Sequence, residues 1–322
     1  MQTGTIRVGA VQAEPVWWDL QGCVAKTVEI IQEAGKKEIK ILGFPEVWIC
    51  GYAWPLWVSP AVANFPFTSE YMQNSMSRDS PEMERIKAAC READVFAVVG
   101  YSERDGGSIY ISQAFISNEG KLVHNRRKIK PTHVERTLWG DGQADSLKTV
   151  VDTPYGKLGA LNCWENFQPL LRYHEYSEGA QIHVAGWPPC PWHPRDVKGS
   201  YMYSMSGEAN QRISQNAAME GQMFVLCSTQ ILKEKSHEKL DMQGKGLFHG
   251  DAGGFAMIFG PDGSLLAEPL GHGEEGILQA DIDLRTIDAA KNLCDAVGHY
   301  SRPDLLSLTV NTKPAKQVRY TE

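Results

Sequence analysis

Short apolar segments alternate with helix-like segments along most of this chain, and this alternation limits the folds that it can adopt. Residues 6–11 are predicted to form a buried strand, after which Val24, Val28 and Ile31 recur at the spacing of one helix face. Residues 39–44 form the next predicted strand. A chain that alternates strands and helices in this order is typical of the α/β class.

The alternation continues to residue 282. Continuous apolar runs indicate strands that are covered on both faces, whereas the turn at Asn118-Glu119-Gly120 predicts a hairpin, so the sheets should be mixed. Residues 51–76 are rich in aromatic residues and proline and are predicted to form an irregular wall of a site. No repeat or linker divides the chain, and we expect one domain over residues 1–322. Further strands are predicted at 95–99, 109–116, 121–123, 182–185, 224–227, 253–259 and 276–282, and further helices from Ser80 onward, at 170–177 and at 202–220.

The composition excludes several classes of partner. A net charge of −7 without a basic stripe argues against nucleic acid. The N-terminal residues do not resemble a secretory signal, and no apolar run reaches the length of a membrane span. Seven cysteines without a CxxC pair indicate reduced thiols rather than a disulfide framework. We therefore expect a cytoplasmic protein that binds neither nucleic acid nor a membrane.

One apolar run, residues 158–162, ends at Cys163, which makes this cysteine a candidate nucleophile. Asn166 and Pro169 follow as a predicted helix cap and a first-turn proline, so backbone N–H groups are expected to point towards the sulfur. Such surroundings favour the thiolate, which is the attacking species. Most free cysteines are small core residues. Cys163 differs from these because charged residues that also follow apolar runs accompany it in the sequence.

Acidic and basic residues also follow other apolar runs. Glu46 comes directly after the strand predicted at 39–44, and Lys128 follows the predicted hairpin, with Glu135 seven residues later. Taken singly, these residues have ordinary interpretations as a solvated carboxylate, a basic surface run and an ion-paired loop residue. A carboxylate at the position of Glu46 can nevertheless serve as a general base.

Together these motifs resemble the nitrilase family of carbon–nitrogen hydrolases. The resemblance runs through 44–46, 127–140, 163–165 and 182–188 to the segment 297–304, and so covers nearly the whole chain. It implies Glu46 as general base, Lys128 as cationic stabiliser, Cys163 as nucleophile and Glu135 as an additional active-site glutamate. It also implies a four-layer αββα sandwich of two mixed sheets with helices outside. We expect no cofactor and no metal. A homo-oligomer is implied by the resemblance, either a dimer or a larger assembly, a spiral included. The family's longer C-terminal tails are linked to spiral assembly, so the short tail after Tyr300 argues against a filament.

The resemblance implies hydrolysis of an organic nitrile, aliphatic or arylaliphatic, to the carboxylic acid and ammonia through a thioimidate and a thioester. Trp164, Tyr52, Trp54 and Trp187 are the predicted substrate-binding residues. A cyanide dihydratase or an amidase on the same Glu-Lys-Cys site is the alternative. The sequence does not indicate which nitrile is preferred, the fraction of amide by-product or the enantioselectivity.

Two further interpretations belong to other classes. His183, Cys190 and His193 form a short cluster that resembles part of a zinc site, but no fourth ligand is spaced with them. A non-catalytic binding protein on the same fold is disfavoured because every expected catalytic position is occupied. Asn166 departs from the family pattern, since many relatives have histidine there.

Overall fold

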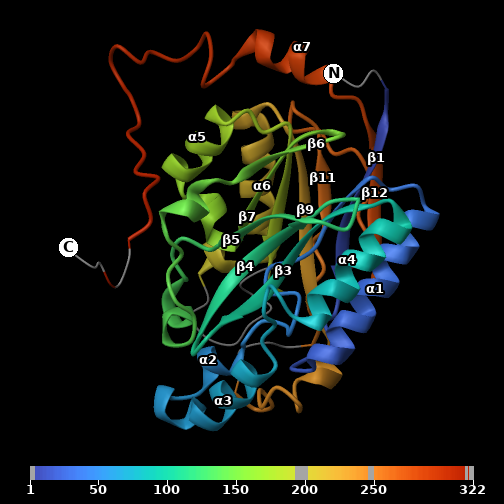
Figure 1. The fold of residues 1–322 in the computed structure, drawn as a ribbon, viewed down its shortest axis with the longest axis vertical. Helices are drawn as coiled ribbons and strands as arrows, with labels where there is room; N and C mark the ends of the chain where they lie inside the picture. The colour runs from blue at the N-terminus through green and yellow to red at the C-terminus, as the bar shows by residue number, and fades with distance from the viewer. Residues whose placement is uncertain (1–3, 193–201, 246–249, 316–317, 319–322) are drawn as a thin grey trace.

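The computed structural model describes residues 4–192, 202–245, 250–315 and 318, and it places strands at the centre with helices around them (Figure 1). The helices are α1 (Leu20–Lys36), α2 (Pro55–Val58), α3 (Phe65–Gln73), α4 (Pro81–Ala93), α5 (Pro169–Ser177), α6 (Gly207–Gly221) and α7 (Thr286–Leu293). The strands are β1 (Ile6–Ala13), β2 (Ile41–Gly43), β3 (Phe96–Asp105), β4 (Ser108–Ile116), β5 (Leu122–Arg127), β6 (Val150–Thr153), β7 (Gly156–Asn162), β8 (Ile182–Trp187), β9 (Phe224–Leu232), β10 (Ala252–Gly253), β11 (Met257–Phe259) and β12 (Gly276–Ile282).

The described strands are linked by pairing in the order β5-β4-β3-β2-β1-β9-β8-β7-β6, with β12 beside β1 and both β10 and β11 beside β9. Neighbours are parallel from β3 to β1 and from β9 to β7, and antiparallel towards both ends of this order. The predictions of an α/β fold and of mixed pairing are therefore confirmed. The two halves of the order join through a short parallel contact, in which Gln12 pairs with Thr229 and Ala13 with Gln230.

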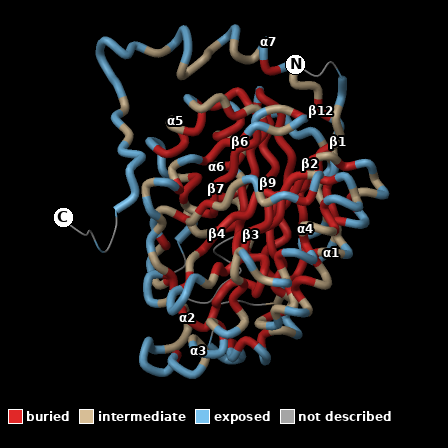
Figure 2. Tube along the Cα trace, viewed as in Figure 1, coloured by how far each residue is buried: buried red, intermediate tan, exposed pale blue. Residues whose placement is uncertain are grey.

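Three apolar clusters show what the sheet packs against. One cluster joins the two halves of the strand order and is built from residues such as Val8, Ile41, Val98, Leu158, Val184 and Leu226. A second lies under α1 and α4, and a third includes residues of β8, β9 and α6. In Figure 1, α1 and α4 lie together on one side of the molecule and α5 and α6 on the other. Buried residues accordingly follow the strands through the centre (Figure 2).

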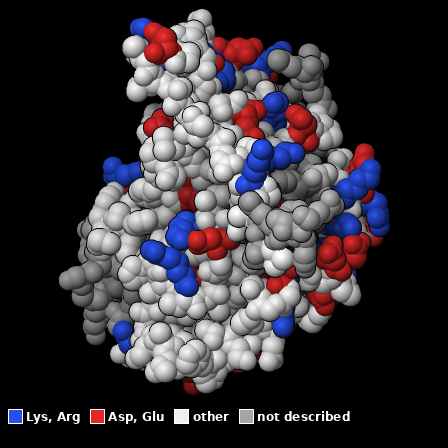
Figure 3. Space-filling view, turned by 60° about the vertical axis from the view of Figure 1, so that its left-hand side comes forward, with Lys and Arg blue, Asp and Glu red and all other residues white. Residues whose placement is uncertain are grey.

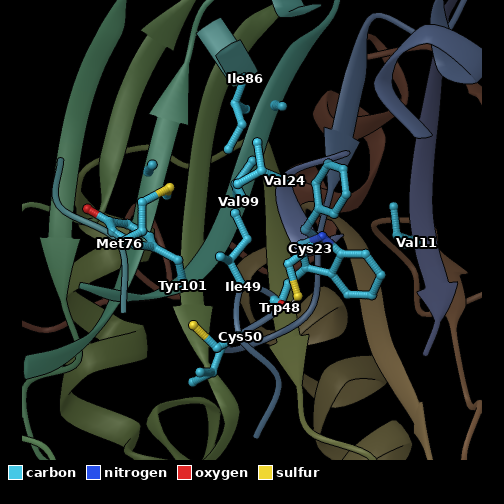
Figure 4. Close-up of a cluster of buried hydrophobic side chains, with 14 of the residues drawn as sticks. Val11, Cys23, Val24, Trp48, Ile49, Cys50, Met76, Ile86, Val99 and Tyr101 are labelled. Atoms are coloured by element: carbon cyan, nitrogen blue, oxygen red, sulfur yellow. Dashed lines mark hydrogen bonds between the residues drawn. The ribbon is translucent and has the colours of Figure 1, made fainter. Parts of the chain in front are cut away.

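The cluster under α1 and α4 anchors the segment that carries Glu46. Trp48 is fully buried, and its indole Nε1 donates to Thr27 Oγ1 of α1 at 2.8 Å. The Cys50 thiol donates to the Asn74 carbonyl and lies among the same apolar side chains (Figure 4). The chain after Glu46 is thus held in the core rather than left as a mobile loop.

Most predicted elements are present, and their ends have identifiable causes. Helix α4 begins as expected, because Ser80 accepts a hydrogen bond from the Met83 N–H at 3.3 Å and Pro81 occupies the first turn. Two predictions were wrong. The segment 51–76 contains α2 and α3, and the helix predicted at 202–220 begins only at Gly207, where Ser206 caps it.

Two glycines allow the main chain of Pro45 and Glu46 to lie against the sheet. A Cβ on Gly100 of β3 would lie 2.0 Å from the Pro45 carbonyl oxygen, and one on Gly186 of β8 would lie 3.0 Å from the Glu46 nitrogen. Any larger residue at Gly100 has to displace backbone. Two strands from different halves of the sheet therefore determine where Glu46 lies.

The outer surface carries charges of both signs. On the face shown in Figure 3, basic and acidic side chains are interspersed. Exposed ion pairs also occur, such as Lys130 Nζ and Asp141 Oδ2 at 2.6 Å. The chain after α7 forms no helix or strand up to residue 315 and is largely exposed. Among the described helices, none has the length and apolar character needed to cross a bilayer.

We predict that Gly100→Ala destabilises the fold because its new methyl group would overlap the Pro45 carbonyl. Overpacking of this kind costs about 1–3 kcal/mol of unfolding free energy. Gly107→Ala is the matched control, since nothing lies within 4 Å of a Cβ at that turn. Urea denaturation followed by circular dichroism measures both; equal midpoints for the two variants would contradict this packing.

Candidate active site

The three residues predicted to be catalytic lie just beyond the carboxyl ends of three strands. Glu46 follows β2, Lys128 follows β5 and Cys163 directly follows β7. Their exposed fractions are 0%, 1% and 5%. The sheet therefore brings residues 35 to 117 positions apart in the sequence into one buried place.

Lys128 is the centre of this group. Its Nζ lies 2.8 Å from Glu46 Oε1 and 2.8 Å from Glu135 Oε2. Glu135 is also buried, with 1% of its surface exposed. One ammonium group thus bridges two carboxyl groups in a site from which water is largely excluded.

Burial and these contacts alter the protonation of the site. Burial raises the pKa of Glu46 to about 8, with Lys128 acting to lower it and Glu135 to raise it. Burial by itself would lower the pKa of Lys128, but Glu135 and Glu46 hold it well above the usual lysine value. Lys128 is therefore a permanent cation, whereas Glu46 can exchange a proton near neutral pH.

Glu135 is fixed from three directions. Its Oε2 accepts the Thr132 N–H at 2.6 Å in addition to Lys128, and its Oε1 accepts the Tyr52 hydroxyl at 2.8 Å. The Trp57 indole in turn donates to the Tyr52 oxygen at 3.1 Å. Tyr52, which the sequence predicted to bind substrate, therefore has its hydroxyl engaged in orienting Glu135.

Cys163 lies at a sharp turn from β7 into a short 3₁₀-helix, Cys163–Phe167. Its φ of 48° is in the left-handed region, which is unusual for a residue with a side chain. Burial raises the pKa of its thiol well above the usual value, Glu46 and Glu135 raise it further, and Lys128 opposes them. The resting sulfur is thus a thiol, and attack requires a nearby base.

The helix cap predicted after Cys163 was wrong. Helix α5 begins at Pro169, and its cap is Gln168, whose side chain accepts the Leu170 N–H at 3.1 Å. Asn166 lies inside the 3₁₀-helix, where its Nδ2 donates to the Cys163 carbonyl at 2.9 Å. The residue therefore holds the backbone of the cysteine and does not begin a helix.

A buried ion pair joins the segments of Lys128 and Cys163, and the sequence analysis missed its arginine. The carboxylate of Glu165 accepts from Arg126 Nη1 at 2.8 Å and Nη2 at 2.7 Å, from the Ile129 N–H at 2.9 Å and from the Asn162 N–H at 3.0 Å. These contacts clamp the end of β5 to the end of β7. Strand alternation was the available signal, because Arg126 in β5 and Lys128 just beyond its end are two residues apart and so are expected on the same side.

A cavity of about 180 Å³ opens beside Cys163 and Glu135. Three tryptophans dominate its wall, and Tyr52 and Thr132 are among its polar members. Trp164 and Trp54 are among its lining residues, whereas Trp187 is not: it is fully buried and donates to Ser214 Oγ at 3.0 Å. The remaining lining residues are Trp57, His133, Pro188, Cys190, Met202 and Met205.

The cluster considered as a zinc site has a different arrangement. His183 uses both ring nitrogens, with Nδ1 2.6 Å from Glu175 Oε1 and Nε2 2.9 Å from Asn166 Oδ1. His193 lies outside the described residues. Within the described parts of the chain, no three histidine, cysteine or acidic side chains converge in a way that suits a metal ion.

Comparison with known proteins is consistent with this geometry. The carbon–nitrogen hydrolase family model matches residues 7–292. A nitrilase of Talaromyces marneffei is 55% identical over 97% of this chain and 97% of its own length. A cyanide hydratase of Armillaria gallica is 49% identical, covering 99% of this chain and 89% of its own length.

A solved structure shares the fold at low sequence identity. The C. elegans NitFhit protein is 19% identical and superposes with a TM-score of 0.75 over 98% of this chain and 70% of its own chain. From the family model and the close relatives together, we conclude that this chain belongs to the carbon–nitrogen hydrolase family and groups there with the nitrilases.

Proposed function

We propose that the protein is a nitrilase that converts an organic nitrile to the carboxylic acid and ammonia, with Cys163 as nucleophile and no metal or cofactor. The proposal rests on the contacts of Lys128, whose Nζ lies 2.8 Å from a carboxyl oxygen of both Glu46 and Glu135. Glu135 and Cys163 line the same cavity. A permanent cation, a carboxyl group that titrates near neutral pH and a buried thiol are the groups that this reaction needs.

Glu46 is the general base of the proposed mechanism. Its Oε1 binds Lys128, whereas its Oε2 is buried without a hydrogen-bond partner among the described residues. That second oxygen takes the thiol proton as the sulfur attacks the nitrile carbon. Glu46 then passes this proton to the former nitrile nitrogen, and the product of the step is a thioimidate.

Two water molecules complete the reaction. The first adds to the thioimidate carbon, ammonia leaves and a thioester remains; the second hydrolyses the thioester to the acid and restores the thiol. Glu46 removes a proton from each attacking water and returns it, in the first step to the nitrogen that leaves as ammonia and in the second to the sulfur of Cys163. Lys128 and the Trp164 N–H stabilise the negative charge that develops on nitrogen or oxygen, and one such donor contributes about 3–4 kcal/mol in other enzymes.

Glu135 acts through Lys128 and the substrate site. Its Oε2 keeps the ammonium charged, and the bonds from Thr132 and Tyr52 prevent the carboxylate from turning away. It also lines the cavity, where it is placed to orient the substrate nitrogen or a water molecule.

The cavity supports a compact organic nitrile as substrate. Its volume of about 180 Å³ is below the roughly 300–1,000 Å³ of clefts for drug-sized ligands. Indole and thioether groups form most of the wall, which suits an aliphatic or arylaliphatic group better than a small polar amide. Cyanide hydration is the second candidate, favoured by the small volume and by the name of the Armillaria gallica relative.

We also propose that the two halves of the strand order stack as the inner layers of an αββα sandwich within one domain of residues 1–322. Support comes from the apolar cluster shared by both halves and from helices packed outside each half. Assembly into a homo-oligomer and a cytoplasmic location remain proposals from the sequence.

We predict that Cys163→Ala and Lys128→Met abolish turnover and that Glu46→Gln lowers kcat by about 10²–10⁴-fold, the usual contribution of a general base. Ammonia release from a nitrile measures the activity, and circular dichroism checks the fold. Cys294→Ala and the exposed Glu29→Gln are matched controls and should behave as the unmodified protein. Substantial activity in a well-folded Glu46→Gln variant would refute the assignment of Glu46 as general base.

We predict that kcat/KM rises as the pH passes through about 8, the value to which burial raises the pKa of Glu46. The base acts as carboxylate, and a raised pKa leaves most of it protonated below that pH, so activity increases with pH. Lys128 stays charged throughout this range because its pKa lies well above the usual value. A rise completed near the ordinary glutamate pKa would contradict this environment for Glu46.

We predict that short aliphatic or arylaliphatic nitriles are hydrolysed faster than either cyanide or acetamide. A panel scored for ammonia, acid and amide measures this directly, because complete hydrolysis releases one ammonia for each acid. Cyanide as the fastest substrate would identify the protein as a cyanide-converting enzyme, and acetamide as the fastest would identify an amidase.

A further inference from the structure

Three buried polar side chains form a connected chain of hydrogen bonds that ends at the backbone of Cys163. Glu175 comes from α5, His183 from β8 and Asn166 from the 3₁₀-helix that follows the cysteine. Their exposed fractions are 1%, 1% and 0%, and none of them lines the cavity of about 180 Å³. The proposed reaction does not use them directly, yet burying such groups is costly unless they are hydrogen-bonded.

The contacts run in one direction towards the cysteine. Glu175 Oε1 lies 2.6 Å from His183 Nδ1, and His183 Nε2 lies 2.9 Å from Asn166 Oδ1. Asn166 Nδ2 then donates to the Cys163 carbonyl at 2.9 Å and to the Leu161 carbonyl at 3.4 Å. The last contact of the chain is therefore the backbone of Cys163 itself.

The hydrogen-bonding groups determine where the protons are. The Asn166 amide must direct its NH₂ at the two carbonyl oxygens, so its Oδ1 faces His183 and requires an N–H at Nε2. A second proton must lie between His183 Nδ1 and Glu175 Oε1. The pair is thus electrically neutral overall, either as imidazolium with carboxylate or as imidazole with carboxylic acid.

The sheet leaves room for this arrangement at one glycine. Gly159 of β7 pairs with His183 of β8, and a Cβ at Gly159 would lie 2.1 Å from Glu175 Oε1. The carboxyl group therefore reaches His183 only because the neighbouring strand has no side chain there. The other oxygen, Oε2, has no hydrogen-bond partner among the described residues, so the bond to His183 is what orients this group.

We propose that Glu175, His183 and Asn166 are positioning residues that hold the Cys163 carbonyl and thereby aim the nucleophile. Cys163 has a φ of 48°, a conformation that a residue with a side chain keeps only when its surroundings impose it. With its carbonyl held, the Cα–Cβ bond and the sulfur keep one direction towards the cavity. The inference rests on the proposed role of Cys163 as nucleophile.

Asn166→Asp tests the link to the cysteine. The new carboxylate still accepts from His183 but has no N–H for the Cys163 carbonyl, so we expect kcat to fall by at least about tenfold with KM within about twofold. Asn292→Asp, exposed on α7, is the matched control. A role in folding alone predicts a lower melting temperature with unchanged kcat, and that result would overturn the proposal.

Two substitutions at Glu175 test the proton arrangement and remain informative if Asn166→Asp does not fold. Glu175→Gln removes the acid but supplies an N–H to Nδ1, so His183 keeps its Nε2–H for Asn166; Glu175→Met has similar length and makes no hydrogen bond. We expect Glu175→Gln to recover most of the kcat that Glu175→Met loses. Equal losses of kcat in the two variants would overturn the proposed positioning role of Glu175, His183 and Asn166.

Cys163→Ala, measured in the same assay, separates this inference from the proposed function. Nitrile hydrolysis by Cys163→Ala would refute both the role of Cys163 as nucleophile and the positioning role proposed for Glu175, His183 and Asn166. If Cys163→Ala is inactive and Asn166→Asp has an unchanged kcat, only the positioning role is refuted.

Discussion

The ammonium group of Lys128, held between two buried carboxyl groups, is the interaction on which the rest of the site depends. Removing three charged groups from water is costly, and each must recover that cost from its partners. Lys128 contacts both Glu46 and Glu135 at 2.8 Å, and Glu135 has further donors in Thr132 and Tyr52. Glu46 has fewer hydrogen-bond partners than Glu135, because its Oε2 lacks a partner among the described residues.

This unequal support divides the roles of the two acids. One cation cannot fully stabilise two carboxylates in an apolar interior, so the less supported acid is the one that takes up a proton. Burial accordingly raises the pKa of Glu46 to about 8. The same electrostatics keep Lys128 charged and Cys163 protonated at rest. A resting thiol, a titrating base and a permanent cation are thus consequences of one arrangement.

The arrangement is kept in place by contacts between segments that are distant in the sequence. The Glu165 carboxylate binds Arg126 and two backbone N–H groups, which ties the end of β5 to the end of β7. Gly100 and Gly186 let the Glu46 main chain approach strands from both halves of the sheet. A buried ion pair that also satisfies backbone donors specifies geometry as much as stability. The proposed positioning residues Glu175, His183 and Asn166 are likewise buried polar groups whose hydrogen bonds fix the backbone of Cys163.

The sequence by itself determined the fold class, most strands and helices, and the strand-end positions of Glu46, Lys128 and Cys163, because hydrophobic periodicity and position relative to a strand are local properties. It did not reveal that Arg126 is buried, that Tyr52 orients Glu135, that Asn166 holds a carbonyl instead of capping a helix, or that Trp187 does not line the cavity. Each of these depends on a partner far along the chain, such as Glu165 for Arg126 or Ser214 for Trp187. Only the tertiary structure decides such pairings, since the direction in which a side chain points and the charge it meets are set by packing between elements and not by neighbouring residues.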